Sequence, residues 1–396
     1  TASGPHLLVL SAKTPTALDA ATRQLADALS SPAAPGDDAL ARIAHTLQTG
    51  RKFFGHRRFV VAQRADAAAA ALRGQGPVKA VSGSVSRAVA PPVVFLLPGM
   101  GDHYVGMSHG LYERFEAFRA DVDRCAEILQ PILGTDIRTV LFPSREEGPA
   151  AAALPRGIDL KRMLGRGPTE PVSPAAQTLE KTIFNQPILF TDEYALARWW
   201  MRQVVEPERI VGQSMCEYVA ACLSGVFSLE AVLRLVAVRA QLVNELPRGA
   251  MLAVMLSERE VSALLGPELS IALINGPKLC VVAGPAAAIE NFQNVLRDRG
   301  AIFRPVRNSH AFHSRLLDPI VDRFAAEVGK VSLSAPRIPF ISNVTGTWIT
   351  AEQATDPRYW AAHARSTARF SDALDQLWQL SDRTLIEIGP GRTLSV

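Results

Sequence analysis

The chain has 396 residues, of which 48% are hydrophobic and 20% are charged, and its formal net charge is +4 at pH 7. This composition excludes a disordered chain and predicts a folded protein with room for two or three compact units. The 42 basic residues are interspersed with 38 acidic ones, so no charged run indicates nucleic-acid binding.

Neither the cysteines nor the N-terminus indicates secretion. Cys125, Cys216, Cys222 and Cys280 show no C-x-x-C or Cys/His spacing, so we expect neither a metal site nor a disulfide framework. No apolar run approaches the ~18 residues that a membrane span requires, and residues 1–15 match no targeting signal. We therefore expect a cytoplasmic protein without membrane contact, and its abrupt start suggests a segment of a longer polypeptide.

Residues 1–75 predict a small α/β unit. An apolar strand at 6–11 precedes a helix that Thr14 caps, and a second helix and the strand "HRRFVVAQ" complete the unit. Residues 76–92 are rich in Gly, Ser, Val and Pro, which predicts an exposed connector to the rest of the chain.

A larger α/β unit follows at 93–248 and resumes at 309–396. It opens with the continuous apolar strand "VVFLL", which is typical of a parallel sheet covered by helices on both faces. We expect helices at 110–129 and in "QPILFTDEYALARWWMRQ", a surface excursion at 143–180, and a short strand "RIVG" that turns into a helix. The returning segment predicts a helix at 315–329 and the strands "IPFISNVTG" and "TLIEIGPG".

The segment 249–308, between these two parts, has its own order of elements. Its pattern of strand, helix, strand, strand, helix and strand is the ferredoxin-like arrangement. We therefore expect a chain of the α/β class, in which a ferredoxin-like subdomain is inserted into the larger parallel-sheet unit.

The octapeptide "VGQSMCEY" nearly spells a G-x-S-x-G nucleophile elbow, with Cys216 in place of the last glycine. Such a turn needs an apolar strand, a small residue, a serine and a helix, and this stretch supplies them, with Gly212 as the small residue. In a nucleophile elbow the serine backbone is strained and its hydroxyl lies above the sheet, beside a helix N-terminus that favours an oxyanion. Cys216 is small enough for this turn. A serine that only caps the helix is the ordinary alternative, but the preceding strand and Gly212 favour a nucleophile at Ser214.

A serine nucleophile needs a base, because the hydroxyl holds its proton tightly at neutral pH. His310 and His313 lie in "NSHAFHSRLLDP", where the chain leaves the inserted segment, and we expect a base there. Either histidine could be an ordinary core or surface residue, and the pattern alone leaves this open.

Arg239 lies on an otherwise apolar helix. It is either a surface residue with a buried stem or a buried anchor for a carboxylate.

Several motifs, in order, resemble the acyltransferase domain of a modular type I polyketide synthase, preceded by the linker that joins it to the ketosynthase. They are "FLLPGMG", "QPILFTDEYALARWW", "GQSMCEYVAACLSG", "INGPKLCVVAGP", "HAFHSRLLDP", "SNVTG" and "IEIGPG". The resemblance spans essentially the whole chain. It implies an α/β-hydrolase-like large subdomain with the ferredoxin-like insert. It also implies that residues 1–75 are the linker and follow a ketosynthase domain of the same polypeptide.

This resemblance assigns catalytic roles by motif. It implies that Ser214 is the nucleophile, that His313 is the base, and that Arg239 binds the substrate carboxylate. It also implies an oxyanion hole formed by the backbone N–H groups of Met100 and Met215. Because these donors are backbone groups, the family's glutamine can be replaced by Met100 without loss of a donor.

The resemblance further implies an acyl pocket with residues from several motifs: Gln186, Gln213, Cys216, His310 and Phe312. It implies that the segment around His363 supplies a backbone carbonyl that orients the base. Three residues depart from the family's spelling, namely Gln213, Cys216 and Met100. We interpret them as tuning of the pocket to a particular acyl group. Decay of the site and drift without consequence are the alternatives.

The implied reaction is a ping-pong transfer without metal or bound cofactor. Ser214 would take an acyl group from acyl-coenzyme A and pass it to the phosphopantetheine thiol of an acyl carrier protein. The resemblance implies malonyl, because "HAFH" is the family's malonyl spelling, and the bulky Phe312 would crowd a substituent on the α-carbon. Because one methyl group supplies only ~1–3 kcal/mol of discrimination, a hydroxy- or methoxymalonyl unit is the alternative. A serine thioester hydrolase and a noncatalytic docking domain are the alternatives of a different class.

Overall fold

The computed structural model describes residues 4–31, 37–86, 90–143, 173–203, 205–306 and 309–394. The chain divides into two compact units, Thr1–Ala90 and Pro91–Val396. Most of the excursion predicted at 143–180 falls on residues 144–172, which lie outside the described residues. Among the helices that are described, every one is too short or too polar to span a bilayer.

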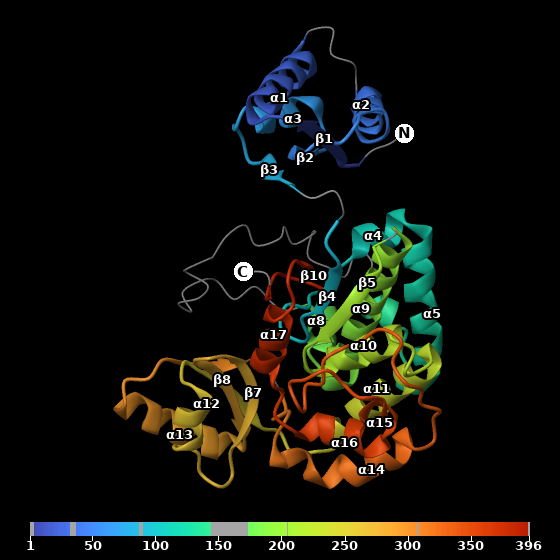
Figure 1. Cartoon of the computed structure of the whole chain (residues 1–396). Helices are drawn as coiled ribbons and strands as arrows, with labels where there is room; N and C mark the ends of the chain where they lie inside the picture. Colours follow the sequence, from blue (N-terminus) through green and yellow to red (C-terminus); the bar gives the residue numbers. More distant parts are fainter. Residues whose placement is uncertain are drawn as a thin grey trace. The chain divides into compact units, whose positions relative to one another are not determined.

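In its described residues, the first unit forms a three-stranded antiparallel sheet with three helices, labelled in Figure 1. Its elements are β1 (His6–Ala12), α1 (Pro15–Ser30), α2 (Asp37–Thr49), β2 (His56–Ala62), α3 (Ala65–Leu72) and β3 (Val81–Ser84). Thr14 caps α1 as predicted, since its hydroxyl accepts from the Ala17 backbone N–H at 3.2 Å. β3 lies inside the stretch predicted as a connector, because β2 supplies a pairing partner for a short, exposed strand. The sheet of this unit therefore extends to Ser84.

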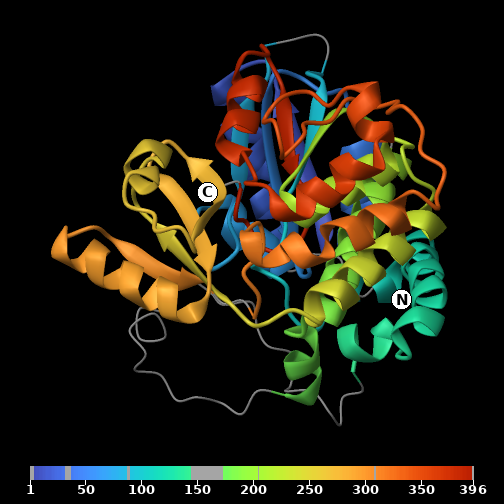
Figure 2. The ribbon, with the colours of Figure 1, turned by 90° about the horizontal axis from the view of Figure 1, so that it is seen from below.

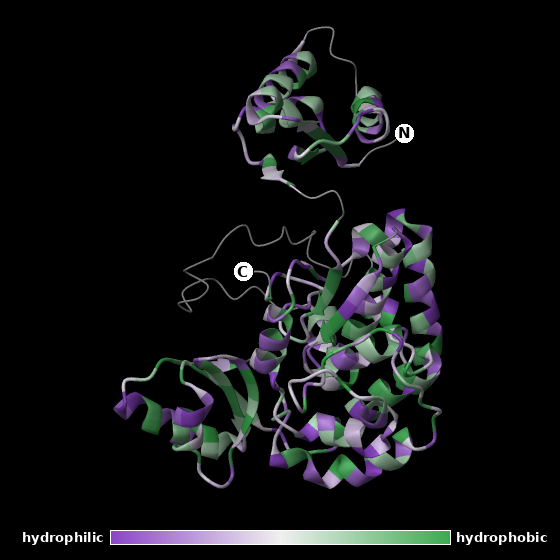
Figure 3. Ribbon diagram, in the orientation of Figure 1, coloured by the Kyte–Doolittle hydropathy of each residue, from purple (hydrophilic) through white to green (hydrophobic). Residues whose placement is uncertain are grey.

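The large subdomain of the second unit contains a parallel sheet in the order β10-β4-β5. The strands are β4 (Val93–Leu97), β5 (Pro207–Gly212) and β10 (Thr384–Glu387). Val94, Phe95 and Leu97 of β4 have no exposed surface, as a strand covered on both faces requires. Figure 3 shows β4 as a hydrophobic ribbon among helices of mixed character.

The helices that the structure describes in the large subdomain pack around this sheet (Figure 1). They are α4 (His109–Arg114), α5 (Glu116–Leu133), α6 (Ile137–Leu141), α8 (Pro174–Leu179), α9 (Thr182–Arg202), α10 (Glu217–Leu223), α11 (Leu229–Asn244), α14 (Asp318–Val328), α15 (Ala351–Thr355), α16 (Pro357–Arg365) and α17 (Phe370–Trp378), with 3₁₀ turns η1 (Ser214–Cys216) and η2 (Arg315–Leu317).

One predicted strand of this subdomain is wrong. The stretch "IPFISNVTG" forms only isolated bridges, between Phe340 and Ile210 and between Ile341 and Trp348. Regular pairing ends there because the chain turns directly afterwards, and Gly346 adopts a positive φ of 70°. The stretch nonetheless reaches the edge of the parallel sheet beside β5.

The inserted subdomain has the predicted ferredoxin-like order. Its elements are β6 (Ala250–Val254), α12 (Glu258–Ser262), β7 (Ser270–Gly276), β8 (Leu279–Gly284), α13 (Ala286–Asp298) and β9 (Phe303–Val306). The strands pair antiparallel in the order β7-β8-β6-β9. Figures 1 and 2 both show this subdomain to one side of the large subdomain. Backbone contacts join the two, including the Ile274 N–H that donates to the Ala368 carbonyl at 2.9 Å. The α/β class with a ferredoxin-like insert is confirmed.

Candidate active site

Ser214 lies at a sharp turn between β5 and η1, with a left-handed φ of 54°. Gly212 makes the turn feasible, because a Cβ there would lie 2.3 Å from the Cys216 carbonyl oxygen. Gly99, in the neighbouring loop, is also constrained, since its Cβ would lie 2.8 Å from the Gln213 carbonyl oxygen. The strained serine and the two close backbone approaches are those of a nucleophile elbow.

The imidazole of His313 faces this serine. Its Nε2 lies 2.6 Å from the Ser214 Oγ, and its Nδ1 lies 2.8 Å from the Ser366 carbonyl oxygen. A carbonyl can only accept, so Nδ1 carries the proton and the unprotonated Nε2 faces the hydroxyl. His313 also has a positive φ, 56°. Both members of the pair are therefore held in an uncommon backbone conformation by the surrounding structure.

Burial and nearby positive charge keep this imidazole neutral. His313 is 2% exposed, and burial lowers its pKa to about 3, with further lowering by His363 and Arg239. The lowered pKa means that the neutral form, which can accept a proton, predominates down to acid pH. A base in this state is ready to take the proton of Ser214 at neutral pH.

Arg239 projects from α11 into the same region and is 1% exposed. Its Nη1 donates a hydrogen bond to Oε1 of Gln186 on α9. The rings of Tyr218 and Phe312 lie 6.0 Å and 5.9 Å from its guanidinium carbon. Burial lowers the pKa of Arg239, but an arginine side chain stays protonated in proteins. Among the described residues it forms no ion pair, and its Nε has no hydrogen-bond partner. The site therefore holds a buried cation that lacks a counter-charge.

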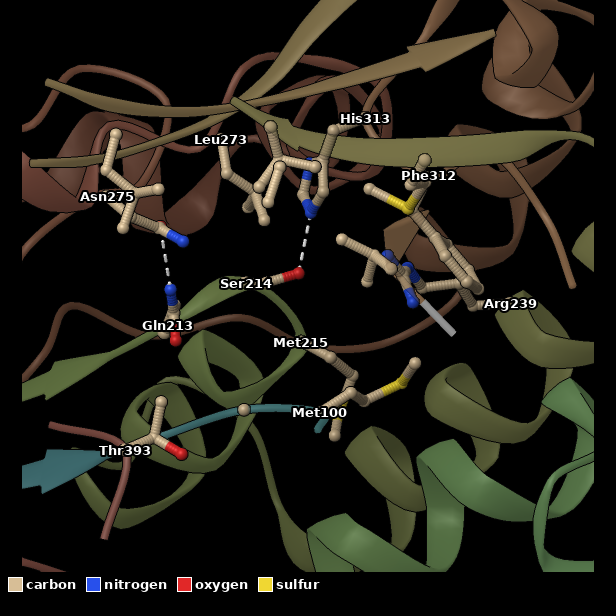
Figure 4. A pocket seen from close by; sticks show the side chains of 16 residues that line it. Met100, Gln213, Ser214, Met215, Arg239, Leu273, Asn275, Phe312, His313 and Thr393 are labelled. Carbon is tan, nitrogen blue, oxygen red and sulfur yellow. Dashed lines mark hydrogen bonds between the residues drawn. The ribbon is translucent and has the colours of Figure 1, made fainter. Parts of the chain in front are cut away.

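A cavity of about 240 Å³ connects these groups. Its lining combines the elbow, the loop of Gly99 and strands of the ferredoxin-like subdomain: Gly99, Met100, Gln213, Ser214, Met215, Arg239, Met251, Ala253, Leu273, Asn275, Leu279, Val281, Val306, Phe312, His313 and Thr393. Figure 4 shows Ser214 between Arg239 and Gln213, with Met100 and Met215 on the elbow side of the cavity. Within the described residues, no cluster of His, Cys, Asp or Glu could hold a metal ion. The cavity can thus accept a small anionic acyl group beside a serine and a neutral imidazole.

Comparison with known proteins gives the family. A model of the acyl transferase domain matches residues 94–395, and a model described as "CurL-like, PKS C-terminal" matches residues 6–72. The chain belongs to the acyl transferase domain family. It is the acyltransferase domain of a modular type I polyketide synthase.

Relatives of this acyltransferase include large synthases. The chain is 34% identical over 99% of its length to a phenolphthiocerol/phthiocerol polyketide synthase of Mycobacterium tuberculosis, of which the match covers 25%. It is 34% identical over 98% of its length to polyketide synthase GfsA of Streptomyces halstedii, of which the match covers 5%. The chain thus spans a quarter or less of these two relatives.

Solved structures agree over the whole chain. The acyl transferase domain of ZmaA is 36% identical with a TM-score of 0.85, and the comparison covers 100% of this chain and 85% of that one. The acyl transferase domain of SpnD, in complex with 2-(pent-4-yn-1-yl)malonyl, is 38% identical with a TM-score of 0.81, covering 100% and 87%.

Three predicted pocket residues of the acyltransferase lie elsewhere. Cys216 is fully buried beneath the elbow, next to the buried carboxyl of Glu193, and it does not line the cavity. The 3₁₀ turn after Ser214 directs this side chain into the core. His310 is buried beside Thr182, with 3.0 Å between its Nδ1 and the threonine Oγ1. Gln186 holds Arg239 instead of lining the cavity. Gln213 and Phe312 do line it.

The carbonyl that orients His313 lies in the predicted segment around His363. It belongs to Ser366, three residues beyond His363, and Ser366 is the C-cap of α16. The last carbonyls of a helix have no partner inside the helix, so they are available to other donors. The His363 ring instead lies 3.3 Å from Oε2 of Glu217, with both side chains fully buried.

Sequence reasoning missed a buried network around Glu217 that supports the elbow. Asn343 accepts from the Ser214 backbone N–H at 2.9 Å and donates from its own backbone N–H to Glu217 at 2.7 Å. The amide of Asn343 also donates to Glu217 Oε2 at 2.5 Å, and the Tyr359 hydroxyl donates to Oε1. Asn343 and Glu217 lie in two of the quoted motifs, "SNVTG" and "GQSMCEY". Their presence there was the available signal, but nothing in the pattern gave their partners.

Proposed function

We propose that this acyltransferase loads a malonyl-type unit from acyl-coenzyme A onto Ser214 and transfers it to the phosphopantetheine thiol of an acyl carrier protein. One observation carries the proposal. The Ser214 Oγ lies 2.6 Å from a neutral imidazole, and both line a cavity that also contains the buried, uncompensated cation of Arg239.

In the first half-reaction, the Ser214 Oγ attacks the thioester carbonyl while His313 Nε2 takes the hydroxyl proton. A carbon–oxygen bond forms, the carbon–sulfur bond breaks, and the imidazolium returns the proton to the departing coenzyme A thiolate. The Ser366 carbonyl holds Nδ1 and keeps the ring oriented through both proton transfers. The backbone N–H groups of Met100 and Met215 are the expected donors to the transient oxyanion.

In the second half-reaction, the thiol of the carrier protein takes the place of coenzyme A. His313 removes the thiol proton, sulfur attacks the acyl carbon, and the bond to the Ser214 Oγ breaks. The serine oxygen recovers its proton from the imidazolium, so the enzyme ends as it began. The exchange of one thioester for another needs no oxidant, reductant or metal.

Arg239 argues for a substrate with a free carboxylate. A carboxylate bound there would supply the missing counter-charge in a fork-like pair. It would also offset the positive charge that lowers the pKa of His313, so a bound malonyl group would make the base stronger. A monocarboxylic acyl group would leave the cation buried and unpaired, which is costly. A simple thioester hydrolase has no need for this cation.

Malonyl is the proposed extender unit. Phe312 lines the cavity and packs against Arg239, so it would crowd a substituent on the α-carbon. The alternative is an α-substituted unit such as hydroxy- or methoxymalonyl. It is favoured by the departures at Gln213 and Met100, both of which line the cavity, and by the substituted malonyl in the SpnD structure.

The proposal includes an acyl carrier protein and a ketosynthase domain as partners, in the cytoplasm. The discriminating experiment offers malonyl-, methylmalonyl- and hydroxymalonyl-thioesters together and reads the acyl adduct by intact mass. We expect a malonyl adduct that is absent in Ser214→Ala and is discharged by added carrier protein. Hydrolysis at a rate independent of carrier protein would favour a hydrolase, and no adduct with any thioester would favour a noncatalytic domain.

A further inference from the structure

Two carboxamide side chains meet in one wall of the cavity. Gln213 comes from the turn between β5 and η1, and Asn275 comes from β7 of the ferredoxin-like subdomain. The Gln213 Nε2 donates to the Asn275 Oδ1 at 2.9 Å. Figure 4 shows this pair on one side of Ser214, with Arg239 and Phe312 on the other side. The two faces of the cavity therefore differ: one holds a cation and the other holds a neutral polar pair.

The pair retains unused hydrogen-bonding groups. Each carboxamide has a carbonyl and an amino group, and the bond between them uses one carbonyl and one amino group. Among the described residues, neither side chain makes another hydrogen bond. One carbonyl group and one amino group remain unused, whichever amide donates to the other. Both residues line the cavity beside the apolar side chains of Leu273, Leu279 and Val281. In a mostly apolar pocket, a few polar groups fix the orientation of a bound ligand.

The proposed function determines which part of a substrate would reach this pair. With its carboxylate on Arg239 and its carbonyl carbon at the Ser214 Oγ, a malonyl thioester must direct its sulfur away from Arg239. That direction leads to Gln213 and Asn275. In coenzyme A, as in a carrier protein, the sulfur is followed by two methylene groups and then by a secondary amide. A secondary amide offers one N–H and one carbonyl, which complements the remaining acceptor and donor.

We propose that Gln213 and Asn275 form the subsite for the first amide of the pantetheine arm and so position sulfur beside Ser214. The inference rests on the proposed function. It gives Gln213, which departs from the family's spelling, a role in binding the arm and not the acyl group. Because the pair joins the two subdomains, an arm bound there would contact both at once.

The test compares thioesters that differ only in this amide. Malonyl-N-acetylcysteamine contains it, whereas malonyl S-butyl thioester does not. In Gln213→Met, which keeps the side-chain length and removes both polar groups, we expect kcat/KM for loading the amide-bearing thioester to fall about 5- to 30-fold. Loading from the S-butyl thioester should stay within about twofold of the parent protein. Asn275→Leu should show the same pattern. Gln379→Met, at an exposed position after α17, is the matched control and should change neither rate.

The second half-reaction tests the acceptor separately. Transfer from the malonyl-enzyme to pantetheine should slow in Gln213→Met, while transfer to 1-butanethiol should not. An equal loss with both thioesters would mean a purely structural pair and would overturn the inference. So would a loss in only one half-reaction, because the subsite is proposed for the arm that both thiols share. If the parent protein forms no Ser214 adduct from either thioester, the proposed function itself fails.

Discussion

The strain at the elbow leads to a sharp prediction for Gly212→Ala. The new Cβ would lie 2.3 Å from the Cys216 carbonyl oxygen, 2.5 Å from its carbon and 2.6 Å from the Glu217 nitrogen. Ordinary contact begins near 3.4 Å, so the start of the helix must move away by about 1 Å. All three atoms belong to the backbone and cannot rotate aside. The shift must therefore displace the turn that holds Ser214.

The magnitude follows from the geometry of the pair. A displacement of about 1 Å at a reacting group can reduce the rate by about 100-fold, and here it would break the 2.6 Å contact between Ser214 and His313. Overpacking of the turn should also lower the free energy of unfolding by about 1–3 kcal/mol. The assay is single-turnover loading from malonyl-coenzyme A followed by intact mass, together with thermal unfolding.

The matched control is Gly266→Ala, because an added Cβ there meets nothing within 4 Å. We expect this variant to load at the parent rate. Folded Gly212→Ala protein that still loads within about threefold of the parent would refute the reasoning. A loss of the same size in Gly266→Ala would refute it as well.

Three further variants or conditions test other parts of the site. Arg239→Met should lower kcat/KM for malonyl loading by about 100-fold and leave acetyl loading unchanged or faster. Competition between malonyl- and acetyl-coenzyme A measures both rates, and an equal loss for both would contradict a carboxylate anchor. Asn343→Ala should lower the free energy of unfolding by about 1–3 kcal/mol, because Glu217 loses the side-chain amide donor and the Ser214 N–H loses its acceptor. It should reduce kcat more than it raises KM. Since the pKa of His313 is lowered to about 3, its neutral form persists as the pH falls. The kcat/KM of loading should therefore stay level from about pH 8 to about pH 5, and an acid limb near the ordinary histidine pKa would count against a buried neutral base.

Local patterns predicted the parts of the fold that depend on neighbouring residues. The apolar run of β4, the Thr14 cap and the ferredoxin-like order all follow from short stretches of sequence. β3 was missed because "VSGS" is exposed and looks like a loop, and it becomes a strand only through its pairing with β2. The prediction for residues 338–346 was wrong in the opposite way. The apolar run predicted a strand, but the chain forms only isolated bridges there and then turns.

The site was harder to predict, because burial and long-range contacts decide it. The resemblance named Ser214 and His313, and the structure brings them together across 99 residues. It also named Cys216 for the pocket, but adjacency in sequence does not give direction, and the 3₁₀ turn buries that side chain. The role of Asn343 arises from a contact 129 residues away in sequence. No local pattern could show it.

The strand that comes last in the sequence bears on the construction of hybrid synthases. β10 pairs with β4 along its whole length, from Thr384 opposite Val93 to Glu387 opposite Leu96. Hydrogen bonds also hold the residues after β10 against the large subdomain. The Leu394 N–H donates to the Glu387 carboxylate at 3.0 Å, and the Thr393 hydroxyl donates to Asp102. A recombination junction placed before residue 384 would pair β4 of one parent with β10 of the other, and would separate Thr393 from its partner Asp102. Exchange of this acyltransferase domain between synthases should therefore keep Val93 through Leu394 from a single parent.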